Sequence, residues 1–212
     1  MSWPYPSRVL TYLTHAQLKE GMAYHEAGHA VAGSLWGFAV APRIFEVPFP
    51  DAEFGIGYTG ETPYSGRVRW AVAVAHTAEA GNIANQLHLQ RTGLWTEDLA
   101  VLVSSDHDRL IAVDTLAEVG FTMHHGRDAP AESLGADGAS WEAVSEQVRR
   151  ALCRLWPQVE EVAADLVMSG SASAERVREI IHGAALHLDL DEMARASASG
   201  PGRPGAVMPR NP

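Results

Sequence analysis

Residues 25–29 read His-Glu-Ala-Gly-His, which is the spacing H-E-x-x-H. On a helix, His25 and His29 share one face with their Cβ atoms about 5–6 Å apart, so both imidazoles can reach one tetrahedral ion at about 2.1 Å. Glu26 is then free to hold a metal-bound water and take its proton, which makes a nucleophile near neutral pH. The pattern predicts a zinc-dependent peptidase with His25 and His29 as metal ligands and Glu26 as the catalytic base.

A catalytic zinc ion usually takes three protein ligands, so the two histidines form an incomplete site. The chain has one cysteine, Cys153, so the remaining ligand is a histidine or a carboxylate rather than part of a thiolate cluster. The metzincin pattern would require Gly at position 32 and His at position 35, which here are Ala32 and Leu35. The third ligand must therefore come from elsewhere in the chain.

Residues 14–36 are expected to form the helix that carries the motif. Thr14 followed by Gln17 resembles a capping box, and Gly37 stands where helices commonly end. Apolar residues fall near the helical face of the two histidines, which predicts that the pair points inward beside the core: Leu18, Met22, Ala32 and Trp36. Two core histidines that hold no metal are the alternative interpretation.

The rest of the chain is predicted to be mainly helical. Strands are expected at residues 44–47 and 54–59, and helices at 68–90, 105–118, 141–168 and 174–187. Ser140 is expected to cap the long helix, Pro157 to kink or split it and Gly170 to end it. Residues 120–140 are rich in glycine and polar residues, which predicts a loop.

These elements predict a mainly α fold with a small β-hairpin, and the H-E-x-x-H motif in the first helix is typical of a zincin-like helical metallopeptidase domain. We expect an N-terminal segment at residues 1–13 and the domain at residues 14–190. Beyond Glu192 the composition is dominated by Ala, Ser, Gly and Pro, which predicts a disordered C-terminal tail at residues 191–212.

The run Tyr-His-Glu-Ala-Gly-His-Ala-Val at residues 24–31 resembles the zinc helix of FtsH-type proteases. Three later segments resemble that family in the same order. Residues 80–84 are similar to its Gly-Gly-Arg-x-Ala segment, and residues 166–177 to the helix–turn–helix near the end of its peptidase domain. Residues 105–112 are similar to the segment in which an Asp, followed four residues later by Ala, supplies the third ligand. The resemblance covers about residues 15–187.

This resemblance implies that Asp108 is the third metal ligand, because Ala112 follows it by four residues. Asp106 is an alternative, and so is a glutamate elsewhere, such as Glu79. Ser105 and Asp108 also fit a capping box, so a purely structural role for Asp108 stays open at this point.

The chain also departs from the family. The Glu that usually follows the Gly-Gly segment falls at Asn85, and no G-x-x-x-x-G-K-[ST] phosphate loop occurs anywhere in the sequence. We therefore expect this chain to lack the ATPase module and membrane anchor of FtsH-type proteases. The resemblance implies a stand-alone peptidase domain that does not itself use ATP, served by a separate ATPase or assembled as a homo-oligomer.

Composition excludes some classes of partner. The net charge is −10, with 26 acidic against 16 basic residues, which argues against nucleic acid or an anionic membrane as the main partner. No apolar run approaches the roughly 20 residues that a membrane-spanning helix needs, and the N-terminus has no pattern of an export signal. A cytoplasmic location is the expectation, with a polypeptide as substrate.

Several other residues have simpler interpretations. His76 and Glu79 are interpreted as a surface contact, His124 and His125 as solvent-exposed, and His182 and His187 as favourable charges near a helix end. Helical apolar spacing assigns five residues to the core: Trp141, Leu152, Cys153, Leu155 and Trp156.

The sequence thus predicts a zinc-dependent metalloendopeptidase, with residues 54–59 as an edge strand that pairs with extended substrate. A zinc-stabilised adaptor or regulatory domain without activity is the alternative, although a structural site has no use for Glu26. A helical interaction module without metal is the third interpretation.

Overall fold

In the computed structural model, residues 13–48, 56–66, 71–97, 99, 106–125 and 138–182 are described. The described part is mainly helical with three small two-stranded sheets, which confirms the expected mainly α fold. The helices are α1 (His15–Leu35), α2 (Val72–Arg91), α4 (Asp106–Ala117), α5 (Trp141–Arg154), α6 (Trp156–Ser169) and α7 (Ala174–His182). No described helix is long and apolar enough to cross a membrane.

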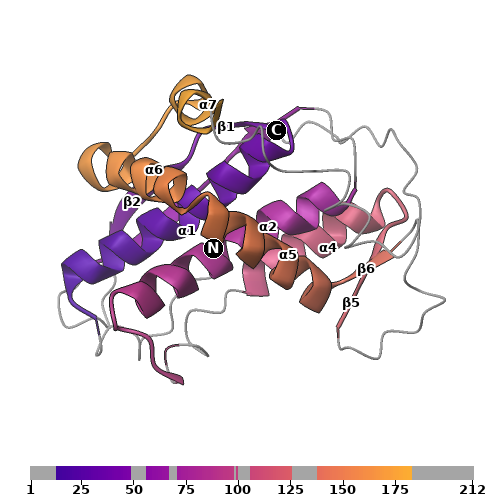
Figure 1. Ribbon diagram of the computed structural model, residues 1–212, viewed down its shortest axis with the longest axis horizontal. Coiled ribbons are helices and arrows are strands. Elements are labelled where there is room, and N and C mark those ends of the chain that lie inside the picture. Colours follow the sequence, from indigo (N-terminus) through magenta and orange to yellow (C-terminus); the bar gives the residue numbers. More distant parts are fainter. Residues whose placement is uncertain are drawn as a thin grey trace.

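Helices α1 and α2 lie side by side at the centre of the molecule and run antiparallel (Figure 1). Tyr24 stacks on His88 near one end of the pair, and Gly33 meets Thr77 near the other. Between them, a Cβ on Gly28 would lie 2.6 Å from the Cβ of Ala84, so only glycine allows this close approach. Helices α5 and α6 pack on α2 and α1 respectively, and α7 lies beside α6.

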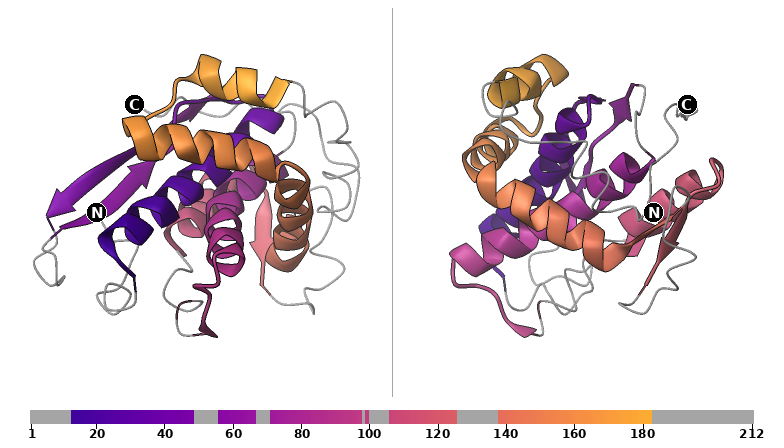
Figure 2. Two further views of the ribbon diagram at one scale, coloured as in Figure 1. Left: turned by 60° about the vertical axis from the view of Figure 1, so that its left-hand side comes forward. Right: turned by 45° about the vertical axis from the view of Figure 1, so that its right-hand side comes forward.

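The sheets are small and lie at the periphery. Strands β2 (Arg43–Pro48) and β3 (Ile56–Glu61) form an antiparallel hairpin beside α1, visible in the left view of Figure 2. Strand β1 (Ala39–Val40) pairs with β4 (Tyr64–Ser65), and β5 (Thr122–His124) pairs in parallel with β6 (Gly138–Ser140). The β5–β6 pair lies near α4, away from the hairpin (Figure 1).

Local sequence signals predicted most helix ends correctly. Thr14 caps α1 and forms a capping box with Gln17, as expected. The long helix expected at residues 141–168 is split just before Pro157, which occupies the first turn of α6, and Gly170 ends α6 at φ 76°. Ser140 caps α5 by accepting a hydrogen bond from the backbone N–H of Ala143. The core positions Trp141, Leu152, Leu155 and Trp156 are buried, as predicted.

The interpretation of Cys153 as a core residue is wrong, because its side chain is exposed. It follows Leu152 by one position, and a step of about 100° around the helix carries it off the buried stripe of α5. The prediction of a loop at residues 120–140 is only partly right, because strands β5 and β6 lie at the two ends of this segment. Strands of three residues leave no periodic pattern to detect.

The interpretation of His76 and Glu79 as a surface pair is wrong as well, because each is only 1% exposed. Helix α2 is covered by α1, α4 and α5, so it is buried on nearly every side and polarity no longer marks its surface. His125 is exposed as expected, whereas His124 is half-buried at the end of β5. His182 lies in the last turn of α7, near the helix end where it was expected. His187, the N-terminal residues 1–12 and the tail at 191–212 lie outside the described residues.

Candidate metal centre

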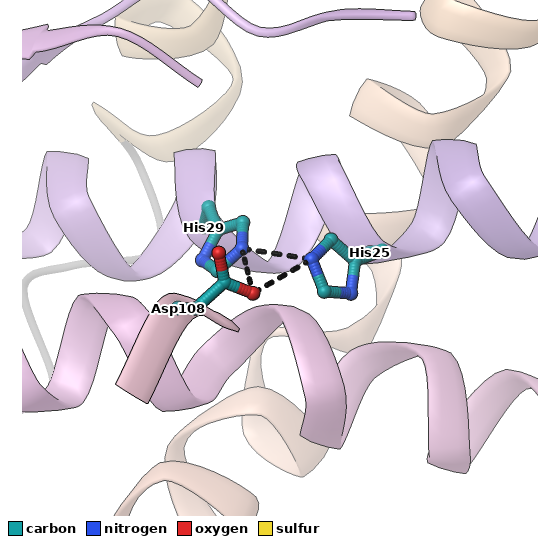
Figure 3. Close-up of side chains that lie close together, drawn as sticks. All are labelled: His25, His29 and Asp108. Atoms are coloured by element: carbon teal, nitrogen blue, oxygen red, sulfur yellow. Dashed lines mark hydrogen bonds and ion pairs between the residues drawn. The ribbon is translucent and has the colours of Figure 1, made fainter. Parts of the chain in front are cut away.

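Three predicted side chains converge between helices α1, α2 and α4 (Figure 3). His25 and His29 extend from α1, and Asp108 reaches them from the first turn of α4. The His25 Nε2 atom lies 3.0 Å from His29 Nε2 and 3.2 Å from Asp108 Oδ2, and His29 Nε2 lies 3.5 Å from the same oxygen. The rings of the two histidines are nearly perpendicular, at 85°.

These spacings match what a tetrahedral ion requires. Three ligand atoms about 2.1 Å from a tetrahedral ion are roughly 3.4 Å from one another. The three separations here, 3.0, 3.2 and 3.5 Å, bracket that value. Two imidazole nitrogens and one carboxylate oxygen are also a common ligand set for catalytic zinc. The donors therefore fit a zinc ion in both chemistry and spacing.

The backbone of α2 fixes the tautomer of His29. Its Nδ1 atom lies 2.7 Å from the carbonyl oxygen of Thr77, and a carbonyl can only accept, so Nδ1 carries the proton and donates it. The neutral ring then presents a lone pair at Nε2, which is the atom that faces His25 and Asp108. A hydrogen bond of this kind orients metal-binding histidines in known sites.

Two further observations indicate that the cluster has room for an ion. Asp108 Oδ2 is buried and has no hydrogen-bond partner among the described residues, although two imidazole nitrogens lie near it. On α2, a Cβ at Gly81 would lie 2.6 Å from His29 Cε1 and 2.8 Å from His25 Cε1. Any larger residue at this position would press against both imidazoles, so glycine keeps the space beside them open.

The charges in the cluster favour a bound cation. Burial lowers the pKa of His29, but the carboxylates of Asp108 and Glu26 and the Thr77 carbonyl outweigh it and raise that pKa to about 9. Burial raises the pKa of Asp108, yet the neighbouring His29 and His25 shift it well below its usual range. A proton or a metal ion can supply the positive charge that this environment stabilises.

Glu26 lies beside the cluster and is 4% exposed. Its Oε2 atom accepts a hydrogen bond of 2.6 Å from the hydroxyl of Thr62, just after β3. A Cβ at Gly60 would lie 2.5 Å from Glu26 Cγ, so β3 passes directly against this side chain. Burial raises the pKa of Glu26, opposed by His25, His29 and Thr62. A buried carboxylate with a raised pKa is suited to accept a proton near neutral pH.

The structure places the alternative third ligands, Glu79 and Asp106, differently. Glu79 does not join the two histidines, because its carboxylate is held by Arg109 and Ser145. Asp106 begins α4, but its side chain lies outside the described part of the chain. Asn85, where the FtsH-type proteases have a glutamate, is 1% exposed on α2. Among the described residues, the group that can hold a metal ion consists of His25, His29 and Asp108.

Sequence reasoning missed the residues that support this centre. None of the three residues belongs to a motif. Thr77 contributes a backbone carbonyl, Thr62 a single hydroxyl and Gly60 the absence of a side chain. Gly81 was noticed only as part of a segment similar to a family pattern. Gly81 stands among several alanines on α2, so its small size is not a specific signal either.

Comparison with protein-family models finds no match to this chain, and comparison with curated proteins finds none either. The likeness to the FtsH-type zinc helix thus stays a resemblance carried by residues 24–31 and the three later segments.

Proposed function

We propose that this protein is a zinc-dependent metallopeptidase, with His25, His29 and Asp108 as the metal ligands and Glu26 as the general base. The observation that carries the proposal is the convergence of three ligand atoms at tetrahedral spacing next to a buried glutamate. The ligand pair and the base come from one turn of one helix, which is the arrangement that H-E-x-x-H motifs use.

In this proposal, His25 Nε2, His29 Nε2 and Asp108 Oδ2 hold the ion. When bound, zinc supplies a Lewis acid that makes a water molecule acidic and polarises the scissile carbonyl. Glu26 accepts the proton of the attacking water and delivers it to the leaving amine. Thr62 holds the Glu26 carboxylate in place through its hydrogen bond to Oε2. Thr77 keeps His29 in the tautomer that offers Nε2.

Strand β3 is the proposed docking edge for substrate. One edge of β3 pairs with β2, and no strand among the described residues pairs with the other edge. Because Gly60 lies against Glu26, an extended peptide added along this strand would pass close to the base. A substrate peptide with N-methylated backbone amides should bind at least tenfold more weakly than its unmethylated counterpart. Equal binding of the two would exclude strand pairing.

The resemblance to FtsH-type proteases supports the same proposal. It implies a polypeptide substrate, whereas the absence of a phosphate loop from the sequence implies hydrolysis that is independent of ATP within this chain. A separate ATPase would then have to deliver folded substrates, and assembly as a homo-oligomer is also compatible with the proposal.

The test compares the natural chain with Glu26→Gln, which has nearly the same shape but cannot accept a proton as a carboxylate does. Bound zinc and cleavage of an unfolded protein are measured for both. The peptidase proposal predicts about one zinc per chain in both and cleavage by the natural chain alone. Zinc without cleavage in either would favour the inactive adaptor, and no zinc in either would favour an interaction module without metal.

A further inference from the structure

A second polar cluster shares helices α2 and α4 with the metal centre and is formed by the buried Glu79 on α2 with the half-buried Arg109 on α4 and Ser145 on α5. The Glu79 carboxylate accepts two parallel hydrogen bonds from Arg109, Nε to Oε2 and Nη2 to Oε1, each 2.7 Å long. Ser145 donates a third hydrogen bond of 2.6 Å to Oε1. The Glu79 side chain is 2% exposed and that of Arg109 is 29% exposed.

Arg109 directly follows the proposed ligand Asp108 in the chain. Both residues belong to the first turn of α4, which begins at Asp106. The N–H groups in the first turn of a helix lack intrahelical partners, and helix ends fray. A ligand in that turn keeps a fixed position only if another contact holds the turn.

We infer that the Glu79–Arg109 pair is a positioning device for the metal centre, which holds the first turn of α4 against α2 so that Asp108 reaches the two histidines. This inference rests on the proposed metal site. The paired, planar geometry of a guanidinium and a carboxylate fixes direction as well as distance, which a single hydrogen bond does not.

The location of Glu79 on α2 gives the pair its function. Thr77, Glu79 and Gly81 occupy alternate positions on that helix, within about one turn. Thr77 orients His29, Gly81 leaves the space beside both imidazoles, and Glu79 holds the turn that carries Asp108. A single turn of α2 therefore positions ligands that come from two different helices, α1 and α4.

A second contact of the guanidinium, with an aromatic ring, supports the same orientation. The Arg109 guanidinium carbon lies 5.1 Å from the centre of the Trp141 ring on α5. A planar cation packed against an aromatic face and a bidentate carboxylate has little rotational freedom. Residues of two helices, α2 and α5, therefore fix the orientation of Arg109. A surface ion pair that only aids solubility does not require such contacts.

The test measures zinc affinity by competition with a chromophoric chelator, in the full chain and in a second chain that carries Asp108→Ala. Glu79→Gln keeps the shape of the side chain but loses the charged, bidentate pair. We expect it to weaken zinc binding 10- to 100-fold when Asp108 is present, the range typical for residues that orient ligands. In the Asp108→Ala chain, the same substitution should change the affinity less than about twofold, because the ligand it positions is gone.

Ser145→Ala is the matched control. It removes one hydrogen bond from the same carboxylate without touching α4, so zinc affinity should stay within about twofold of the natural chain. Arg109→Lys keeps the positive charge but loses the bidentate geometry of the guanidinium. It should weaken zinc binding by a factor between those of Ser145→Ala and Glu79→Gln. It also provides a second test if Glu79→Gln fails to fold in circular dichroism. The visible absorption of bound Co²⁺ should change in Glu79→Gln and Arg109→Lys but not in Ser145→Ala, because it reports ligand geometry rather than stability.

Each outcome separates this inference from the proposed function. If the natural chain binds zinc and Glu79→Gln binds it equally well, the positioning role is wrong and the metal site stands. An equal loss with and without Asp108 also overturns it, because the effect would then be general destabilisation. If the natural chain binds no zinc, the proposed function fails and this inference fails with it. Zinc binding without peptide cleavage leaves the positioning role in place.

Discussion

Glu79 and Asp108 are two carboxylates with opposite surroundings, the first buried and the second half-buried. Glu79 faces three hydrogen-bond donors, two from Arg109 and one from Ser145. The buried oxygen of Asp108 faces two imidazole nitrogens, and that of His29 has no proton in its neutral form. Three of the roughly four lone pairs of the Glu79 carboxylate already meet donors, which leaves it little capacity for a metal ion. A carboxylate oxygen that faces other lone pairs instead favours a cation between them. The surroundings, and not the residue type, distinguish a structural carboxylate from a ligand.

The largest effect should come from removing a ligand. His25→Ala should lower zinc affinity more than about 1000-fold, because the loss of a direct ligand exceeds the 10- to 100-fold cost of losing a residue that only orients one. The control is His107→Ala, which removes an exposed histidine next to Asp108 and should leave zinc binding unchanged. Chelator competition measures both. Tight zinc binding by His25→Ala would contradict the assignment of the ligands.

A pair of glycine substitutions should separate the metal from the base. Gly81→Ala places a methyl group against His29 and His25 and should weaken zinc binding about 100-fold. Gly60→Ala places one against Glu26, so it should keep zinc and lower peptide hydrolysis by a similar factor. Bound zinc and hydrolysis are measured on both variants after thermal melting has shown that they fold. If the two variants showed the same changes in bound zinc and in hydrolysis, the two glycines would not act separately on the metal ligands and on the base.

The two carboxylates should also differ in how they couple stability to pH. In the metal-free chain the pKa of His29 is raised to about 9, against an ordinary value of 6.5. Its contribution to stability is therefore fully present below about pH 6.5 and is lost as the pH rises through about 9. At ~1.4 kcal/mol per pKa unit, the loss is on the order of 3 kcal/mol.

Urea unfolding between pH 6 and pH 10 measures this dependence. Asp108→Asn should flatten it by removing the charge that raises the pKa of His29. Glu79→Gln should lower stability throughout the range without changing the slope, because its partner Arg109 stays charged at all these pH values. Saturating zinc should remove the slope from the natural chain, since His29 then has no proton to lose. A slope that survives Asp108→Asn would show that another group causes it.

How much of this centre the sequence could predict depends on the range of the contacts. His25, Glu26 and His29 lie in one helical turn, so their spacing alone determines that they share a face. The capping of α1 by Thr14 and the break before Pro157 are equally local. Asp108 is separated from the histidines by about 80 residues and was predicted only from a family resemblance.

Contacts between distant segments explain what the sequence did not predict. Glu79 was considered both as a surface residue and as an alternative ligand, since its burial and its pairing with Arg109 depend on the packing of three helices. Thr62 and Gly60 reach Glu26 because the β2–β3 hairpin lies against α1. Short-range patterns carry no information on such contacts, and hydrophobic periodicity is weak in helices that are buried on nearly every side, such as α2.

The surroundings of Glu26 are intermediate between those of Glu79 and Asp108. Glu26 is buried like Glu79 but accepts a hydrogen bond from one side chain, that of Thr62. A hydrogen bond to the charged form of a carboxylate lowers its pKa, so Thr62→Val should raise the pKa of Glu26. A general base works above its pKa, and the acidic limb of the kcat/KM profile should therefore move to higher pH by about half a unit to one unit.

Activity on the high-pH plateau should fall less than threefold. Thr62→Ser retains the hydroxyl and should restore the acidic limb of the natural chain, which distinguishes the hydrogen bond from the packing of the methyl group. An unchanged limb in Thr62→Val would mean that Thr62 is not what adjusts the base. The balance between donors and burial, which separates Glu79 from Asp108, would then not extend to Glu26.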